Sequence, residues 1–460
     1  MELERKLANY VSDSRYEDLP KEVVDTTKNV ILTILGTTIA GATEEGCEAI
    51  VNQVKEWGGK EEATILIYGG KVPAYNAVLA NSTMARALDI CDGMVPGMHL
   101  GSSSVPTALA MAELVGGCSG KELLAAIALG SEVAARINVI SDYDGFDPTG
   151  VCTIFATAAI AGKILHLNST QMLNALALAF NKSGGSFQSN IDGALAVRLI
   201  QAFVSQGGII CAQLAKRGIT GPQNFIEGIY GYFHLYAKDK HNEQGLAGEL
   251  GDRFEMTKIL FKSYPSCGGT IASTDAILGL IREKDLTPAN VARIDINVTP
   301  YIYKLVGHPF AVGDNARVNA QFNIRYCVAN ALLRRGSKLS HFEDSSIKEP
   351  LILDLIKKIH VTPDPALESE QRELFCKMAI KVTTTKGSVY HKTVDIPSGF
   401  PGNPLSKEQH EERFQDYVSY GGKPLPKENI DKLVAMINQL EEIEDVRSLI
   451  PLLLSDQRRR

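Results

Sequence analysis

Asp89, Asp92 and His99 are the residues of this chain whose types and spacing point most directly to chemistry. The two aspartates lie one turn apart at the end of a helix predicted over residues 73–88, so both can face the same side. Glycine and proline in the next segment predict a loop, which allows His99 to fold back toward them. A carboxylate beside an imidazole could remove a proton from a carbon next to a substrate carboxylate.

The residues after this loop predict a helix N-terminus that could bind an anion. Ser102, Ser103 and Ser104 are followed by Pro106, which is typical of a first helical turn. Unpaired backbone N–H groups and the helix dipole attract negative charge there, so Ser102 and Ser103 are candidate substrate-binding residues. Residue types alone leave a structural alternative open, in which the aspartates and serines cap helices and the histidine is a loop residue.

The composition is that of an ordinary globular chain with room for two domains. The 460 residues are 45% hydrophobic and 22% charged, with a net charge of −6. This charge gives no reason to expect a nucleic-acid or membrane-surface partner. The N-terminus lacks the apolar segment of a signal peptide, and the apolar run from Val30 to Ala42 is too short to span a bilayer, so we expect a cytoplasmic protein.

Cysteine and histidine spacing argues against a metal centre. The eight cysteines are scattered without a C-x-x-C motif, so we expect reduced thiols and no iron–sulfur cluster. The nine histidines contain no H-x-x-x-H or H-E-x-x-H motif, so we expect no metal site.

The predicted fold class is mainly α, with an all-α helical domain and a smaller α+β domain. Residues 1–262 contain successive helical patterns with Ala- and Gly-rich faces, which favour close helix packing, and residues 400–460 return to helix and complete this domain. Residues 263–399 contain strand patterns over 293–298, 359–362, 377–384 and 388–394, which predict a small antiparallel sheet. Lys386-Gly387 predicts a hairpin turn, and Ser119 with Glu122 predicts a capping box.

Several segments resemble the MmgE/PrpD family, which includes 2-methylcitrate dehydratase, cis-aconitate decarboxylase and iminodisuccinate epimerase. The resemblance covers nearly the whole chain, and its segments fall in the family's order. They are VILTILGTTIAGA (30–42), ALDICDG with the following histidine and VPTALAMAE (87–113), GFDPTGV (145–151), AKRGITGP (215–222), KSYPSCGGT (262–270) and GNPLSKEQHEERF (402–414).

This resemblance implies a helical core with a lid-like second domain, a homodimer, and a metal-free, cofactor-independent active site. Such a site would act on small carboxylic acids by removing a proton next to a carboxylate. Asp89, Asp92 and His99 match positions of the family's first motif, and Lys262, Tyr264 and Cys267 match its KSYPSCGGT-like segment.

The chain departs from the family pattern at several polar positions. Asp147 stands where dehydratases and decarboxylases of the family typically carry histidine, which adds negative charge near an anionic substrate. The other replacements are Cys91 for aspartate, Gly93 for threonine, Val197 for lysine, and Arg86, Ile200 and Ile271 for histidine, while Arg198 remains.

Three hypotheses follow. The first is a dehydratase- or decarboxylase-type lyase, similar to 2-methylcitrate dehydratase, in which Asp92, His99, Asp147 and Tyr264 transfer protons. Its substrate-binding residues would be Asp89, Ser102, Ser103, Arg198, Lys262 and Cys267, with the two cations as carboxylate anchors. The second is an isomerase or epimerase, which needs two opposed proton-transfer groups and no leaving group. The third is a non-catalytic homologue that binds a partner or ligand.

Structural roles remain open for the residues outside the first motif. Tyr264 could simply pack near the domain boundary, and Lys262 could be a solvated charge. Cys267 fits a small buried hydrophobic residue, and Arg198 could pair with Asp192.

Overall fold

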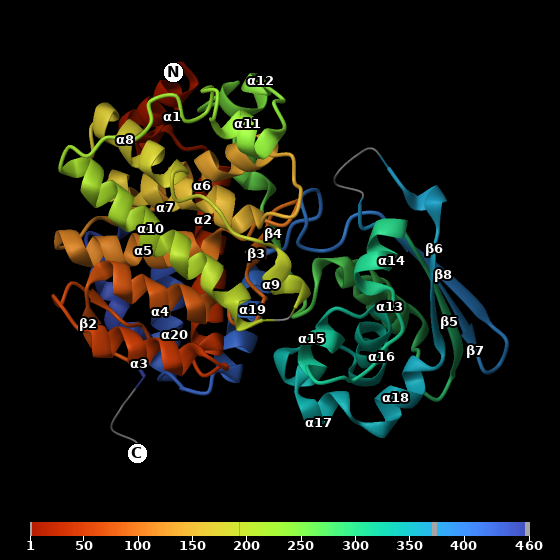
Figure 1. The fold of residues 1–460 in the computed structure, drawn as a ribbon. Coiled ribbons are helices and arrows are strands. Elements are labelled where there is room, and N and C mark those ends of the chain that lie inside the picture. The colour runs from red at the N-terminus through yellow and green to blue at the C-terminus, as the bar shows by residue number, and fades with distance from the viewer. Residues whose placement is uncertain (1, 193, 370–374, 456–460) are drawn as a thin grey trace. The chain divides into compact units, whose positions relative to one another are not determined.

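The computed structural model describes residues 2–192, 194–369 and 375–455, which form two compact units (Figure 1). The first unit contains the chain up to Ile259 and again from Tyr417, and the second is Leu260–Asp416. The sequence pattern predicts these boundaries at residues 263 and 400. Phe400 packs in the hydrophobic core of the second unit, so the chain re-enters the first unit later than expected.

The first unit is helical, as predicted. Its helices are α1 (Glu2–Asp13), α2 (Lys21–Gly41), α3 (Cys47–Trp57), α4 (Ala74–Arg86), α5 (Gly101–Val115), α6 (Gly120–Ile140), α7 (Pro148–Ile164), α8 (Ser169–Phe180), α9 (Gln188–Ile191), α10 (Leu199–Lys216), α11 (Tyr232–Ala237), α12 (Glu243–Ala247) and α20 (Lys427–Asn438), while α19 (Lys407–Tyr420) continues from the second unit into the first.

Small residues bring the central helices close together. Helix α10 packs against α7, α4 and α8, and α6 packs against α7 (Figure 1). A Cβ atom on Gly208 of α10 would lie 2.2 Å from Thr157 Oγ1 and 2.6 Å from the Ala158 nitrogen of α7. Glycine is therefore required where these helices cross. The capping box of Ser119 and Glu122 at the start of α6 is confirmed by reciprocal hydrogen bonds.

A fully buried arginine ties α6 to the segment that follows α12. Arg136 Nε donates to Glu132 Oε1 at 2.5 Å, and its Nη atoms donate to the carbonyl oxygens of residues 246, 248, 249 and 253. Glu132 Oε2 accepts the Met256 N–H at 2.9 Å. Both charges are thus removed from water with hydrogen-bond partners in place.

The second unit contains a four-stranded mixed sheet in the order β6-β5-β7-β8. Strands β5 (Val291–Val298), β7 (Met378–Thr384) and β8 (Val389–Val394) pair antiparallel, and β7 and β8 form the predicted hairpin at Lys386-Gly387. Strand β6 (Ile359–Pro363) pairs parallel with β5, so the prediction of an antiparallel sheet is wrong for this pair. The helices between β5 and β6 supply the long crossover that parallel pairing requires.

Helices of the second unit pack against this sheet and against one another. They are α13 (Gly268–Lys284), α14 (Pro300–Val306), α15 (Ala316–Gln321), α16 (Ile324–Arg334), α17 (Asp344–Ile347) and α18 (Pro350–Ile356). Helix α13 packs on β7 and β8, and α16 packs on β6 (Figure 1). Ile294 and Ile296 of β5 and Val382 of β7 are buried in the resulting core.

Two helical segments among the described residues have the length and apolar composition of membrane-spanning helices. In Gly120–Ile140, 94% of the apolar 18-residue window is buried inside the protein, as expected of a core helix, and in Leu195–Lys216 the buried share of this window is 50%. Phe203 and Leu214 lie on the uncovered part of the second segment, with 54% and 39% of their surface exposed.

We expect the Arg136→Met substitution to lower the free energy of unfolding by about 3–5 kcal/mol, because it leaves Glu132 as a buried charge without its cation. Urea unfolding followed by circular dichroism measures this effect. The double substitution Arg136→Met with Glu132→Gln should recover part of the loss. Equal instability of the single and double variants would contradict this explanation.

Candidate active site

A closed loop between α4 and α5 brings the first motif together within the first unit. Asp89 follows α4, Asp92 begins the short strand β3 (Asp92–Gly93), and backbone hydrogen bonds join Met94 and Met98 in both directions. His99 therefore returns toward the aspartates, as the loop prediction required. Its Nε2 atom lies 3.9 Å from Asp89 Oδ1, and its Nδ1 atom lies 2.7 Å from the Asp92 carbonyl oxygen.

The hydrogen bond at Nδ1 determines which nitrogen of His99 can act as a base. A carbonyl oxygen only accepts, so Nδ1 must carry a proton. In the neutral ring, Nε2 is then unprotonated and lies on the side of the Asp89 carboxylate. The Cys91 sulfur is 3.6 Å from Nδ1, which places this thiol beside the same ring nitrogen.

Asp92 is committed to the N-terminus of α5. Its carboxylate is fully buried and accepts the Leu100 N–H at 3.1 Å and the Gly101 N–H at 3.0 Å. Burial raises the pKa of Asp92, and these backbone N–H groups oppose that shift. The anion at this helix N-terminus is thus a side chain of the protein itself. The proton-transfer role of Asp92 stays a prediction.

The serines of α5 also have structural contacts. Ser102 donates to the Ala85 carbonyl oxygen at 3.4 Å, and Ser103 donates to that of Leu100 at 3.0 Å; both are fully buried. The helix begins at Gly101, and Pro106 lies inside it rather than near its start. The helix starts earlier than predicted because the Asp92 carboxylate supplies the cap.

Asp147 is the N-cap of α7 and is linked to His99 through Thr149. Asp147 Oδ1 accepts the Thr149 N–H at 2.8 Å, while Thr149 Oγ1 accepts the His99 N–H at 3.1 Å. Burial raises the pKa of Asp147, and the Thr149 N–H and Arg86 oppose that shift. Ile200 packs beside this turn. Its Cδ1 atom is so close that a Cβ atom added to Gly150 or Gly185 would lie 2.8 Å from it.

Arg86 is a site residue that sequence analysis noted only as a replacement. It is the last residue of α4, and its Nη1 atom contacts Asp89 Oδ1. Burial lowers the pKa of Arg86, but Asp89, Cys91 and Asp147 more than offset this, so the pKa lies above its ordinary value. The i, i+3 spacing of Arg86 and Asp89 is the signal that could have identified the pair.

Arg198 and Val197 lie at the approach to α10. The Arg198 guanidinium donates to the Glu45 carbonyl oxygen, and Asp192 accepts from the Gln188 side chain at 2.7 Å. These contacts do not include the Arg198–Asp192 pair considered as a structural alternative. Arg198 remains a predicted carboxylate anchor, held in this structure by a backbone carbonyl.

The other predicted residues belong to the second unit. Tyr264 donates its hydroxyl proton to Asp275 Oδ1 at 2.8 Å, and burial and this carboxylate both raise the pKa of Tyr264. Lys262 is buried, with 5% of its surface exposed, so it is not the solvated charge considered from the sequence. Cys267 caps α13 and is nearly buried, and Ile271 lies in the hydrophobic core.

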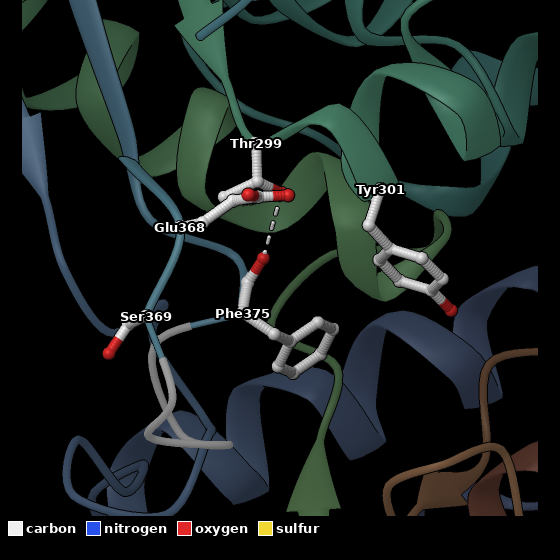
Figure 2. Close-up of a pocket in the computed structure, with 5 residues that line it drawn as sticks. All are labelled: Thr299, Tyr301, Glu368, Ser369 and Phe375. Carbon is white, nitrogen blue, oxygen red and sulfur yellow. Dashed lines mark hydrogen bonds between the residues drawn. The ribbon is translucent and has the colours of Figure 1, made fainter. Parts of the chain in front are cut away.

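The second unit also contains a cavity of about 420 Å³ that sequence analysis did not anticipate (Figure 2). It is lined by Thr299, Tyr301, Glu368, Ser369 and Phe375, and none of the predicted site residues lines it. In the described part of the chain, no three His, Cys, Asp or Glu side chains are grouped as a metal site would require. Within the first unit, the contacts described above bring together the side chains of Arg86, Asp89, Asp92, His99 and Asp147.

We expect Asp147→Asn to stabilise the protein at pH 7, because asparagine retains the N-cap and removes a buried charge. The raised pKa of Asp147 means that folding favours its protonated form. The charge therefore costs stability above the folded pKa, and the advantage of asparagine should shrink as the pH falls toward the ordinary value of 3.8. Urea midpoints of both proteins across this range test the prediction, and a variant that is less stable at every pH would contradict it.

Comparison with known proteins agrees with the sequence resemblance. Residues 5–244 match the MmgE/PrpD N-terminal domain, and residues 264–439 match the MmgE/PrpD C-terminal domain. Human cis-aconitate decarboxylase is 25% identical over 95% of this chain and 91% of its own length, and the mouse protein is 23% identical over 97% and 92%. The cis-aconitate decarboxylase-like protein oryM of Aspergillus oryzae is 21% identical over 97% and 96%. Because both domain models match and together cover most of the chain, this protein belongs to the MmgE/PrpD family.

Proposed function

We propose that this protein is a lyase that acts on a small carboxylic acid, with His99 transferring the proton and Asp89 stabilising the protonated imidazole. The observation that carries the proposal is the position of the His99 ring, whose Nδ1 atom contacts the Asp92 carbonyl oxygen and whose Nε2 atom is 3.9 Å from the Asp89 carboxylate. The relatives described above carry decarboxylase names, which favours a carboxy-lyase over a hydro-lyase. The proposal includes no metal or cofactor, because imidazole and carboxylate groups of the chain can carry out the proton transfers.

The geometry suits either direction of proton transfer. In a dehydration, neutral Nε2 would take a proton from carbon while the C–O electron pair leaves with the hydroxyl group. In a decarboxylation, the C–C bond electrons remain on the substrate when carbon dioxide leaves, and the protonated Nε2 would supply the proton that they require. Asp89 stabilises the imidazolium in both cases.

Asp147 supports the same proposal as a second titratable group near the His99 backbone. Its raised pKa favours a protonated carboxyl group more than for an exposed aspartate, so it suits the role of an acid. The Thr149 contact couples the position of this loop to that of His99.

We expect His99→Asn to lower kcat by about 10²–10⁴-fold, since it removes the proton-transfer group. The wild-type protein is incubated in deuterium oxide with mono-, di- and tricarboxylates, including cis-aconitate and 2-methylcitrate, and products and deuterium incorporation are followed by NMR. His391→Asn, at an exposed position on β8, is the matched control.

Loss of substrate to a decarboxylated or dehydrated product supports the lyase. Deuterium incorporation without net conversion would replace it with an isomerase. Silence across the panel, or a His99→Asn variant as active as the wild type, would contradict the proposal.

We also propose that the chain forms a homodimer through the apolar face of α10. Phe203 and Leu214 are exposed on this largely apolar helix, and a second copy of the chain would cover them. Analytical ultracentrifugation should give twice the 49.9 kDa chain mass, and Phe203→Glu should shift the protein toward the monomer. Leu351→Glu, at an exposed position on α18, is the control. A monomeric wild type, or a Phe203→Glu variant that remains dimeric, would contradict this interface.

A further inference from the structure

We propose that Arg86 is a positioning residue whose guanidinium holds the Asp89 carboxylate beside the His99 imidazole. This inference rests on the function proposed above, in which His99 transfers the proton and Asp89 stabilises the imidazolium. Arg86 Nη1 contacts Asp89 Oδ1, and the same oxygen is the atom 3.9 Å from His99 Nε2. One carboxylate oxygen therefore lies between the permanent cation and the nitrogen that exchanges the proton.

The backbone of Asp89 shows that its position is imposed by its surroundings. Its φ of +55° lies in the left-handed region, which a residue other than glycine adopts at an energetic cost. Asp89 lies three residues after Arg86, the last residue of α4, so this conformation turns the chain shortly after the helix ends. The ion pair with Arg86 stabilises the carboxylate in the resulting position.

Comparison with Arg136 separates this role from a purely structural one. Arg136 is saturated, because its donors bind Glu132 and four backbone carbonyl oxygens. Arg86 is also buried, with 6% of its surface exposed, but its contact is with Asp89 and its Nε atom is buried without a hydrogen-bond partner among the described residues. Burying a guanidinium with an unused donor costs stability, so packing does not explain why arginine occupies this position. The interaction of its positive charge with Asp89 does.

The groups that interact electrostatically with Arg86 come from two segments of the first unit. Asp89, Cys91 and Asp92 belong to the loop after α4, and Asp147 belongs to the start of α7. Loss of the Arg86 cation from this environment favours protonation of both Asp89 and His99. Substitution of Arg86 should therefore change the titration of Asp89 and of His99, although both side chains remain in the protein.

NMR titration of protein labelled with ¹⁵N-histidine tests the inference without any substrate. His99→Asn assigns the His99 signals among the nine histidines. We expect Arg86→Gln to raise the His99 titration midpoint by about half a pH unit or more, and Arg86→Lys, which retains the charge, to stay near the wild type. An unchanged midpoint in a folded Arg86→Gln variant, or equal shifts in both variants, would overturn the proposal.

Kinetics then separates positioning from substrate binding. We expect Arg86→Gln to lower kcat by about 10–100-fold, with a smaller effect on KM and with the acid limb of the kcat/KM profile moved to higher pH. Arg86→Lys should restore the position of the acid limb. Arg293→Gln, which removes a largely exposed ion pair with Asp295 on β5, is the control.

A raised KM with unchanged kcat would overturn positioning in favour of a carboxylate anchor. A lowered thermal midpoint with an unchanged pH profile would overturn it in favour of a structural role. If the wild type turns over none of the acids tested, the proposed function fails, while the NMR titration still decides whether Arg86 governs the pair.

Discussion

The Asp92 carboxylate at the N-terminus of α5 is the interaction on which this site depends. A helix N-terminus leaves backbone N–H groups without partners, and a buried carboxylate needs donors, so each satisfies the other. This contact joins residue 92 to residues 100 and 101 and closes the loop between them. His99 is the last residue of that loop, and the Asp92 carbonyl oxygen orients its ring. A Cβ atom on Gly101 would lie 2.5 Å from Asp92 Oδ1, which explains the glycine at this position.

Three aspartates that look alike in the sequence therefore have different environments. Asp92 is fully buried and bound to backbone N–H groups, and Asp147 is a buried N-cap with a raised pKa. Asp89 lies between Arg86 and His99. Burial, backbone donors and the nearest cation decide whether each carboxylate supports the fold or is available for proton transfer.

The positions at which this chain departs from its family show two structural outcomes. Ile271 lies in the hydrophobic core of the second unit, where an apolar side chain is stabilised by burial. Ile200 instead packs beside the turn that holds Asp147, so its side chain bears on the candidate site. Near the site, Ile200 replaces a polar side chain that is usual in the family, while Arg86 on α4 supplies a buried cation.

The sequence by itself determined the helical first unit, the hairpin at Lys386-Gly387, family membership, and the approach of His99 to two aspartates. Family membership follows from motifs spread along the whole chain. The other features follow from short-range periodicity, turn residues and capping, which involve neighbours in the chain. Only the tertiary structure decided the parallel pairing of β5 and β6, the burial of Lys262, the capping role of Asp92 and the contact of Arg86 with Asp89. The physical reason is that a buried polar group takes whichever donor, acceptor or charge the fold brings to it, and residue spacing alone does not specify that partner.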